Sequence, residues 1–304
     1  MDLSVGAPVD PTPSVVERAL TSASQAPGYP LTRGTPALRH AAAQYMRRRW
    51  AADLDPENVL PVIGTKELVA WLPTLLGCGP ADSVAFPELA YPTYEVGALL
   101  AGATPVPAPS LTSLGPRRVR LLWVNSPGNP DGRVLPAEHL AKVVAWARER
   151  GVVVASDECY LEFGWDAEPV SILDPDVCGD SHEGLLAVHS LSKRSNMAGY
   201  RAGFVAGDPG VVAGLHEVRR HAGMVVPGPV QAAMVAALDD GDHVVEQRGW
   251  YRSRRGLLRA ALGEAGFRIE KSQGSLYLWA TRDEPAMDSV MWLARRGVLV
   301  APGD

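Results

Sequence analysis

The segment most diagnostic of the architecture is Gly184-Leu-Leu-Ala-Val-His-Ser-Leu-Ser-Lys193. It begins with an almost wholly apolar run, which predicts a short strand buried within a parallel sheet. The polar residues that follow then lie at the carboxyl end of this strand, where α/β proteins bind their ligands. Lys193 is therefore the first candidate for a functional residue.

The chemistry around Lys193 predicts a cofactor that carries both a carbonyl group and a phosphate. A lysine that is partly removed from water loses its proton more readily and can then attack a carbonyl group. Ser190, Ser192 and Arg201 bring the hydrogen-bond donors that a phosphate requires. Together these residues indicate pyridoxal phosphate, although Ser-x-Ser-Lys is a common sequence and a lysine after a strand is usually a solvated surface residue.

The composition indicates a globular chain and gives no sign of nucleic-acid binding. The 304 residues, of which 46% are hydrophobic, are enough for one large domain or two ordinary ones. The net charge is -5, and the arginine runs Arg47–Arg49 and Arg252–Arg255 both fall within helical patterns. We therefore expect no nucleic-acid partner.

The cysteines and histidines give no sign of a disulfide framework or a metal site. Cys78, Cys159 and Cys178 show no Cys-x-x-Cys spacing, and the seven histidines show no His-Glu-x-x-His spacing. No N-terminal segment combines a basic region with an apolar core, and no apolar run approaches the about 20 residues of a membrane span. We expect a cytoplasmic protein without a metal or a membrane partner.

Helical and strand-like patterns alternate along most of the chain. Helices are expected over 36–51, 67–76, 137–150, 211–221, 242–262 and 288–296. Strands are expected over 3–5, 59–63, 83–86, 120–124, 152–155, 185–188, 203–206, 267–270 and 275–279. This alternation predicts an α/β fold with a mostly parallel sheet and helices on both faces. We expect a large cofactor domain over 27–245 and a smaller α+β domain formed by 1–26 and 246–304.

Two further strand ends carry residues suited to a phosphate or a ring. Gly64-Thr65-Lys66 opens a helix after a strand, and free backbone N–H groups at a helix start bind anions. The alternative is an ordinary N-cap at Thr65. Asp157 and Tyr160 follow another strand, where a buried carboxylate would keep a pyridine nitrogen protonated and a phenol would reach the phenolic oxygen of the ring. The alternative for Asp157 is a cap on the next turn.

Loops carry the remaining candidates. Asn125–Gly132 follows a strand and, taken alone, is a tight turn. Aromatic residues interrupt loops at Tyr29, Tyr91 and Tyr94. Tyr91 is placed to stack on a flat heterocycle, although packing against the core is the commoner fate of a tyrosine.

In order and spacing, six segments resemble the motifs of fold-type I pyridoxal-phosphate aminotransferases of the aspartate aminotransferase-like group. They are Tyr29–Gly34, Gly64–Lys66, Ala90–Pro92, Asn125–Gly132, Asp157–Tyr160 and Ser190–Arg201. Segments 61–77, 86–102 and 189–209 further resemble actinobacterial N-succinyldiaminopimelate aminotransferases of lysine and cell-wall precursor synthesis. The resemblance implies a transaminase that moves an amino group between N-succinyl-LL-2,6-diaminopimelate and 2-oxoglutarate.

The resemblance also implies a role for each residue around the cofactor ring. Lys193 would bind the cofactor covalently and then move a proton between the substrate Cα and C4′ of the cofactor. Asp157 would pair with the pyridine nitrogen, Tyr160 and Asn129 with the phenolic oxygen, and Tyr91 would stack on the ring.

The implied phosphate site involves two subunits. Its residues would be Thr65, Lys66, Ser190, Ser192, Arg201 and, from a partner subunit, Tyr29. A site completed by the neighbour implies a homodimer. Gly6 resembles the glycine whose backbone lies near the substrate carboxylate, and Asn129 would also contact the substrate.

The chain departs from the family pattern at two places. The family turn usually reads Asn-Pro-Thr-Gly, and here Asp131 replaces the threonine. The sequence also ends at Asp304, before the arginine-containing strand that grips the substrate carboxylate in family members, so we expect a small domain truncated at both chain ends. Arg33 or Arg282 would then have to take over the carboxylate.

Three alternatives to this function stay open. The chain could be a truncated, catalytically impaired cofactor-binding fragment, or an aminotransferase for another amino acid. Ser190 and Lys193 also satisfy the Ser-x-x-Lys pattern of penicillin-recognising enzymes, but the Ser-Asp-Asn and Lys-Thr-Gly elements of that class do not occur.

Overall fold

A seven-stranded sheet forms the centre of the computed structural model, which describes residues 1–303. Its strands are β1 (Val59–Ile63), β2 (Ser83–Pro87), β3 (Thr104–Ala108), β4 (Val119–Asn125), β5 (Val153–Asp157), β6 (Leu185–Ser190) and β7 (Ala202–Gly207). Their order across the sheet is β1-β7-β6-β5-β4-β2-β3. Neighbours from β3 to β6 run parallel, and β7 is antiparallel to both β6 and β1. The prediction of a mostly parallel α/β sheet is confirmed.

Helices cover both faces of this sheet. They are α1 (Ser14–Ser22), α2 (Pro36–Trp50), α3 (Thr65–Leu75), α4 (Thr93–Leu100), α5 (Ala137–Arg150), α6 (Pro175–Cys178), α7 (Pro209–His221), α8 (Gly228–Asp239), α9 (Asp242–Glu264) and α10 (Ala286–Ala294). Short 3₁₀ turns are η1 (Pro56–Asn58), η2 (Leu111–Leu114) and η3 (Ala198–Tyr200).

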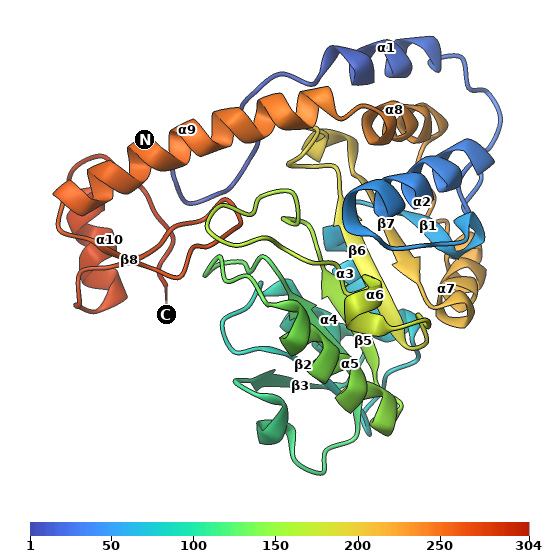
Figure 1. Cartoon of the computed structure of the whole chain (residues 1–304), viewed down its shortest axis with the longest axis horizontal. Helices are drawn as coiled ribbons and strands as arrows, with labels where there is room; N and C mark the ends of the chain where they lie inside the picture. The colour runs from blue at the N-terminus through green and yellow to red at the C-terminus, as the bar shows by residue number, and fades with distance from the viewer. Residues whose placement is uncertain (304) are drawn as a thin grey trace.

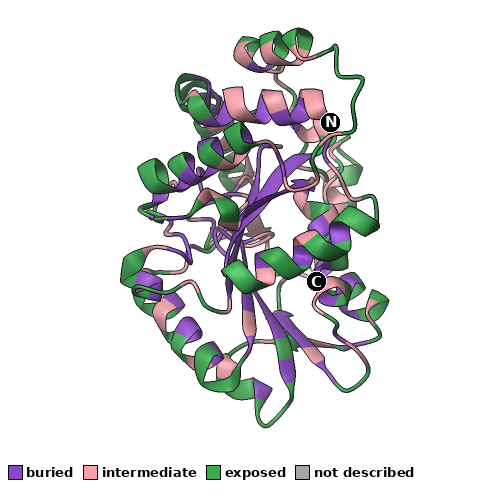
Figure 2. Cartoon of the chain, turned by 90° about the vertical axis from the view of Figure 1, so that its right-hand side faces the viewer, coloured by how far each residue is buried: buried purple, intermediate pink, exposed green. Residues whose placement is uncertain are grey.

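Alternate residues of each central strand feed two separate hydrophobic cores. Val154 of β5 packs in the core that includes residues of α2, α5 and α8, whereas its neighbour Ala155 packs in the core with residues of α3, α4 and α7. Every residue of β6 is buried, because both of its faces are covered. Figure 2 shows the buried strands at the centre and the exposed outer faces of the helices.

The C-terminal elements lie away from the sheet. Helix α9 runs outward from α8 to the hairpin of β8 (Arg268–Glu270) and β9 (Trp279–Thr281) and to α10 (Figure 1). The N-terminal segment joins them, because the Leu3 amide donates to the Leu299 carbonyl at 2.8 Å. Helix α1, by contrast, packs against α8. No helix within residues 1–303 is both long enough and apolar enough to cross a membrane.

The sequence prediction missed α1, α4, α8 and the edge strand β3. Strand β3 contains Pro105 and Pro107, which argue against a strand except at a sheet edge, where β3 lies. Helix α8 starts with Gly228-Pro229, which suggests a loop although proline is well tolerated in a first helical turn. Tyr94 lies within α4 and not in a loop as predicted.

Two predicted strands are wrong. Over 275–279 only the last residue is in a strand, β9, and Ser275 has a left-handed φ of 67° that a strand does not accept. Over 3–5 there is no strand, and an isolated bridge pairs Asp2 with Leu299. Neither segment has a neighbour that would complete a regular ladder.

Candidate active site

The predicted functional residues gather at one edge of the sheet because their strands share a direction. Strands β4, β5 and β6 are parallel, and β1 points the same way as β6 because both are antiparallel to β7. Their carboxyl ends place Gly64, Asn125, Asp157 and Ser190 along this edge. Arg201 directly precedes β7 and so reaches the same edge.

Lys193 lies half-buried in the loop after β6. Its Nζ donates to the carbonyl oxygen of Gly6, which brings the N-terminal segment to the site. Burial lowers the pKa of Lys193, and the positive charge of Arg201 lowers it further. No carboxylate lies within ion-pair distance of Lys193 in the part of the chain that the structure describes. The uncharged amine that a nucleophile or base requires is thereby favoured.

Asp157 is the buried last residue of β5. Its Oδ2 accepts a hydrogen bond from the Tyr94 hydroxyl at 2.8 Å, and its Oδ1 accepts one from the Cys159 amide at 3.2 Å. Burial raises the pKa of Asp157, while these two bonds favour the carboxylate. Asp157 forms no ion pair with any residue between 1 and 303, so its charge lacks a cationic partner within the chain.

Tyr160 and Asn129 approach the site from the two loops beside Asp157. The Tyr160 side chain is buried, and its hydroxyl lies 3.0 Å from the Tyr277 hydroxyl. Asn125 ties the Asn129 turn to β5, because its Nδ2 donates to the Asp157 carbonyl at 2.9 Å and its Oδ1 accepts from the Asn129 amide at 2.7 Å.

An anion cradle forms where α3 begins. Gly64 is the N-cap, with a φ of 72°, and a Cβ added there would collide with the guanidinium of Arg201. The first turn of α3 has no side-chain cap, so its N–H groups remain available to an anion. Thr65 is the first helical residue and not the N-cap, so the alternative interpretation of Thr65 as a cap is wrong.

The remaining cradle residues lie close to this helix start. The Ser190 hydroxyl accepts a hydrogen bond from the Ser192 amide at 3.1 Å, which tightens the loop before Lys193. The Lys66 Nζ lies 5.8 Å from the centre of the Tyr91 ring, and Tyr91 packs edge-on against Tyr94.

Three predicted residues are not brought to the site within the chain. Tyr29 is fully exposed on the surface. Arg33 pairs with Glu57 at 3.0 Å. Arg282 packs over the Trp292 ring and lies 3.5 Å from Glu284.

Sequence reasoning missed three residues that line the site. They are Tyr94, Tyr277 and Cys159, whose thiol donates to the Thr65 hydroxyl at 3.2 Å. Tyr94 follows Tyr91 by three residues, so recognition of α4 would have placed both on one helix side. Nothing in the local sequence of Tyr277 points to the site, because only the tertiary fold brings it there.

The geometry fits pyridoxal phosphate. Lys193 and Asp157 are groups of opposite charge that no neighbour compensates, and a ligand with a carbonyl group and a protonated ring nitrogen would use both. The Gly64 cradle has room for an anion beside Arg201 only because glycine has no Cβ. These are the features that a phosphate-bearing pyridine requires.

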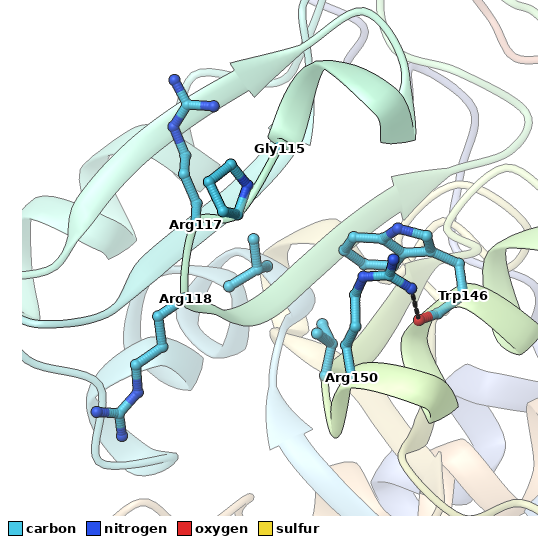
Figure 3. Close-up of a pocket in the computed structure, with 8 residues that line it drawn as sticks. Gly115, Arg117, Arg118, Trp146 and Arg150 are labelled. Atoms are coloured by element: carbon cyan, nitrogen blue, oxygen red, sulfur yellow. Dashed lines mark hydrogen bonds between the residues drawn. The ribbon is translucent and has the colours of Figure 1, made fainter.

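A separate cavity of about 240 Å³ lies at the opposite edge of the sheet. Figure 3 shows its Arg117, Arg118 and Arg150 around Trp146, near the amino-terminal end of β4. Each arginine already has a partner: Arg117 donates to the Ser113 carbonyl, Arg118 pairs with Asp82, and Arg150 donates to the Trp146 carbonyl. None of the residues that line this cavity belongs to the Lys193 site.

Comparisons with known proteins agree with this site. A profile of the family "Aminotransferase class I and II" matches residues 1–304. The chain is 59% identical over 303 residues to the 4-dedimethylamino-4-oxo-anhydrotetracycline transaminase OxyQ of Streptomyces rimosus, and covers 84% of that protein. It is 62% identical over 305 residues to a probable aminotransferase of Mycobacterium tuberculosis, of which it covers 73%. Both alignments include 100% of this chain.

A solved structure extends the comparison. The N-succinyldiaminopimelate aminotransferase of Mycobacterium tuberculosis superposes with a TM-score of 0.88 at 29% identity. The match covers 98% of this chain and 83% of that one.

Proposed function

This chain belongs to the class I and II aminotransferases, and on that premise we propose that it moves an amino group between N-succinyl-LL-2,6-diaminopimelate and 2-oxoglutarate. The family makes it a pyridoxal-phosphate-dependent transaminase. The observation that carries the proposed chemistry is the half-buried Lys193, with its lowered pKa, at the edge that also holds the buried Asp157. The substrate is supported by the likeness to the N-succinyldiaminopimelate aminotransferase structure.

Lys193 and Asp157 divide the proton chemistry in this proposal. Bound pyridoxal phosphate supplies an electron sink for the negative charge that develops at the substrate Cα. Lys193 Nζ acts as the base that takes the proton from Cα, and its lowered pKa increases the uncharged fraction. The Asp157 carboxylate holds a proton on the ring nitrogen, and Tyr94 keeps that carboxylate in place through its hydroxyl.

The other residues bind and orient. Tyr160 and Asn129 hold the phenolic oxygen, and Tyr91 covers the ring face. The phosphate is held by the helix start and the β6 loop, through Thr65, Lys66, Ser190, Ser192 and Arg201. Gly6 and Asn129 lie beside the substrate, a position supported by the contact between the Gly6 carbonyl and Lys193.

We propose that the active form is a homodimer in which Tyr29 of each subunit completes the other's phosphate site. The support is that Tyr29 is fully exposed and Leu31 beside it is 56% exposed. A cytoplasmic location is also proposed, and it is supported by three cysteines that are all free thiols.

The proposed domain boundaries place 27–245 in a large cofactor domain and 1–26 with 246–304 in a small domain. The pairing of Leu3 with Leu299 supports the small domain. Helix α1 connects the two, because it lies in the small domain's sequence and packs on α8 of the large one.

A second candidate substrate is a polycyclic ketone. The 59% identity to the oxo-anhydrotetracycline transaminase OxyQ favours it. The chain would then still use Lys193 and Asp157, but the residues around Gly6 would contact a large ring system.

A panel of half-reactions tests the substrate proposal. The purified holoprotein is mixed separately with N-succinyl-LL-2,6-diaminopimelate, LL-diaminopimelate, glutamate, aspartate and phenylalanine, and the cofactor absorbance is followed. The ketone 4-dedimethylamino-4-oxo-anhydrotetracycline is offered to the glutamate-treated protein. We expect the highest second-order rate constant with N-succinyl-LL-2,6-diaminopimelate, with glutamate also active. Preference for aspartate, phenylalanine or the polycyclic ketone would overturn this assignment.

A further inference from the structure

Tyr277 occupies a position in the site that the proposed mechanism does not use. Its hydroxyl lies 3.0 Å from the Tyr160 hydroxyl, and the two rings meet edge to face with centroids 5.7 Å apart. On its other side, a Cβ added to Gly6 would lie 3.0 Å from the Tyr277 hydroxyl. Tyr277 therefore lies between the tyrosine assigned to the phenolic oxygen and the N-terminal segment that receives the Lys193 hydrogen bond.

A strained strap fixes the approach of Tyr277. We use this name for residues 271–275, in which Lys271, Ser272 and Ser275 have left-handed φ values of 52°, 56° and 67°. Such values are unfavourable for residues with a side chain. They persist because surrounding contacts hold the backbone, and Tyr277 follows directly after.

The strap is bonded to the loops that carry the cofactor residues. The Ser272 amide donates to the Asp131 carbonyl at 2.8 Å, and the Gly274 amide donates to the Gly132 carbonyl at 2.8 Å. The Ser275 amide donates to the Phe163 carbonyl at 2.9 Å. Asp131, which replaces the usual threonine, adds an ion pair with Lys271 at 3.4 Å. The strap thus joins the Asn129 turn and the Tyr160 loop to Tyr277.

Proton counting determines what Tyr277 can do for Tyr160. A phenol carries one proton to donate and an oxygen that accepts. If Tyr160 donates its proton to a ligand oxygen, its own oxygen can only accept from Tyr277. Burial raises the pKa of both phenols, and Tyr91, Cys159 and Asp157 raise that of Tyr277 further. Both hydroxyls therefore keep their protons at neutral pH.

We propose that Tyr277 is a positioning residue whose hydroxyl donates to the Tyr160 oxygen and so directs the Tyr160 proton to the phenolic oxygen of bound pyridoxal phosphate. This inference rests on the proposed function, in which Tyr160 faces that oxygen. A donor that itself accepts a hydrogen bond is polarised and becomes a stronger donor. Tyr277 thereby favours the ionised phenolic oxygen of the cofactor.

The test is a pH titration of the absorbance of the bound cofactor. Wild type, Tyr277→Phe, Tyr160→Phe and the double variant are loaded with pyridoxal phosphate and titrated, with loading and melting temperature measured for each. Loss of one hydrogen bond should raise the titration pKa of Tyr277→Phe by about 0.5 to 1. Tyr160→Phe should raise it more, and the double variant should match Tyr160→Phe because Tyr277 acts only through Tyr160.

Two further variants keep the result interpretable. Tyr45→Phe removes a buried hydroxyl that contacts Glu162 and Trp50, and should leave the titration unchanged. Gly6→Ala keeps Tyr277 but presses a methyl group against its hydroxyl. It should raise the pKa in the wild-type background and have no effect in the Tyr277→Phe background.

The outcomes separate this inference from the proposed function. An unchanged pKa in Tyr277→Phe, or an equal rise with and without the Tyr160 hydroxyl, overturns the inference alone. A wild-type protein whose bound cofactor shows no titration at all contradicts the inference and the proposed function together.

Discussion

Gly64 is the residue at which the anion cradle depends on a missing side chain. An alanine there would have to adopt a φ of 72°, and its Cβ would displace the Arg201 guanidinium. We expect Gly64→Ala to weaken pyridoxal phosphate binding by about tenfold, which corresponds to the loss of about one charge-assisted hydrogen bond. Equilibrium dialysis of the cofactor measures this.

Gly77 provides the matched control for that change. It has a φ of 70° and no atom within 4 Å of its added Cβ. Gly77→Ala should therefore lose stability by about 1 kcal/mol through backbone strain, as Gly64→Ala does, yet bind the cofactor normally. Equal cofactor affinity in the two variants would show that Gly64 is only a turn residue.

His243 gives the fold a pH dependence of known sign. It lies between the Ser195 hydroxyl and the Asp240 carboxylate, each at 2.9 Å, and burial lowers its pKa below the ordinary 6.5. Below that value the unfolded chain takes up the proton before the folded chain does. The contribution of His243 to the free energy of unfolding is therefore fully present above pH 6.5 and decreases as pH falls through the folded pKa.

His243→Asn removes this dependence. Urea unfolding should show that the variant is less stable than wild type at pH 7.5 and that the difference becomes smaller toward pH 5. A stability difference that stays constant across this range would mean that His243 does not titrate as its burial requires.

At the scale of elements, the contact between α3 and α4 positions the helix start that forms the cradle. A Cβ at Gly97 of α4 would lie 2.8 Å from the Val69 carbonyl oxygen of α3. Gly97→Ala should lower the free energy of unfolding by about 1 to 3 kcal/mol because the helices must separate. Chemical denaturation gives the value.

Gly249 lies inside α9 with nothing within 4 Å of its added Cβ. Gly249→Ala should therefore raise the free energy of unfolding by about 0.5 to 1 kcal/mol through helix propensity. The two substitutions are chemically identical, so the same sign at both positions would rule out close helix packing as the cause.

Elements with a clear period could be predicted from the sequence, and elements that depend on neighbours could not. Helix α5 was predicted with its observed bounds, because Leu140, Val143, Val144 and Ala147 repeat at helical spacing. Helix α4 contains Gly97, which is a poor helix former, and is stabilised by its packing on α3.

The same distinction applies to the site. Residues at strand ends, such as Asp157, were predictable because parallel strands bring their carboxyl ends to one edge. Tyr94 bonds Asp157 from a helix that the sequence did not reveal. Tyr277 reaches Tyr160 through a strap whose left-handed backbone has no sequence signature.

At the scale of the whole molecule, the proposed dimer predicts complementation between inactive subunits. Tyr29→Ala and Lys193→Ala proteins, each nearly inactive, are unfolded together and refolded at equal amounts. A hybrid dimer has one site with both residues intact, so random pairing should restore about one quarter of the wild-type sites. Transaminase activity of the mixture checks this.

A same-subunit pair is the control for complementation. Arg201 and Lys193 belong to one chain's site, so mixing Arg201→Ala with Lys193→Ala should restore nothing. Absence of recovery with the Tyr29 variant as well would show that Tyr29 does not act across the interface.

The central claim is that Lys193 is the residue that binds the cofactor. The chain has four lysines, and Lys66 lies near the same site beside Tyr91. Burial lowers the pKa of Lys193, which favours attack by its uncharged amine.

Borohydride reduction of the pyridoxal-phosphate-loaded protein, followed by proteolysis and peptide mass mapping, tests this claim most directly. The account predicts one reduced cofactor adduct per chain, on Lys193 and absent from the Lys193→Ala protein. An adduct on Lys66, Lys142 or Lys271 in place of Lys193, or no adduct in folded protein saturated with cofactor, would contradict it.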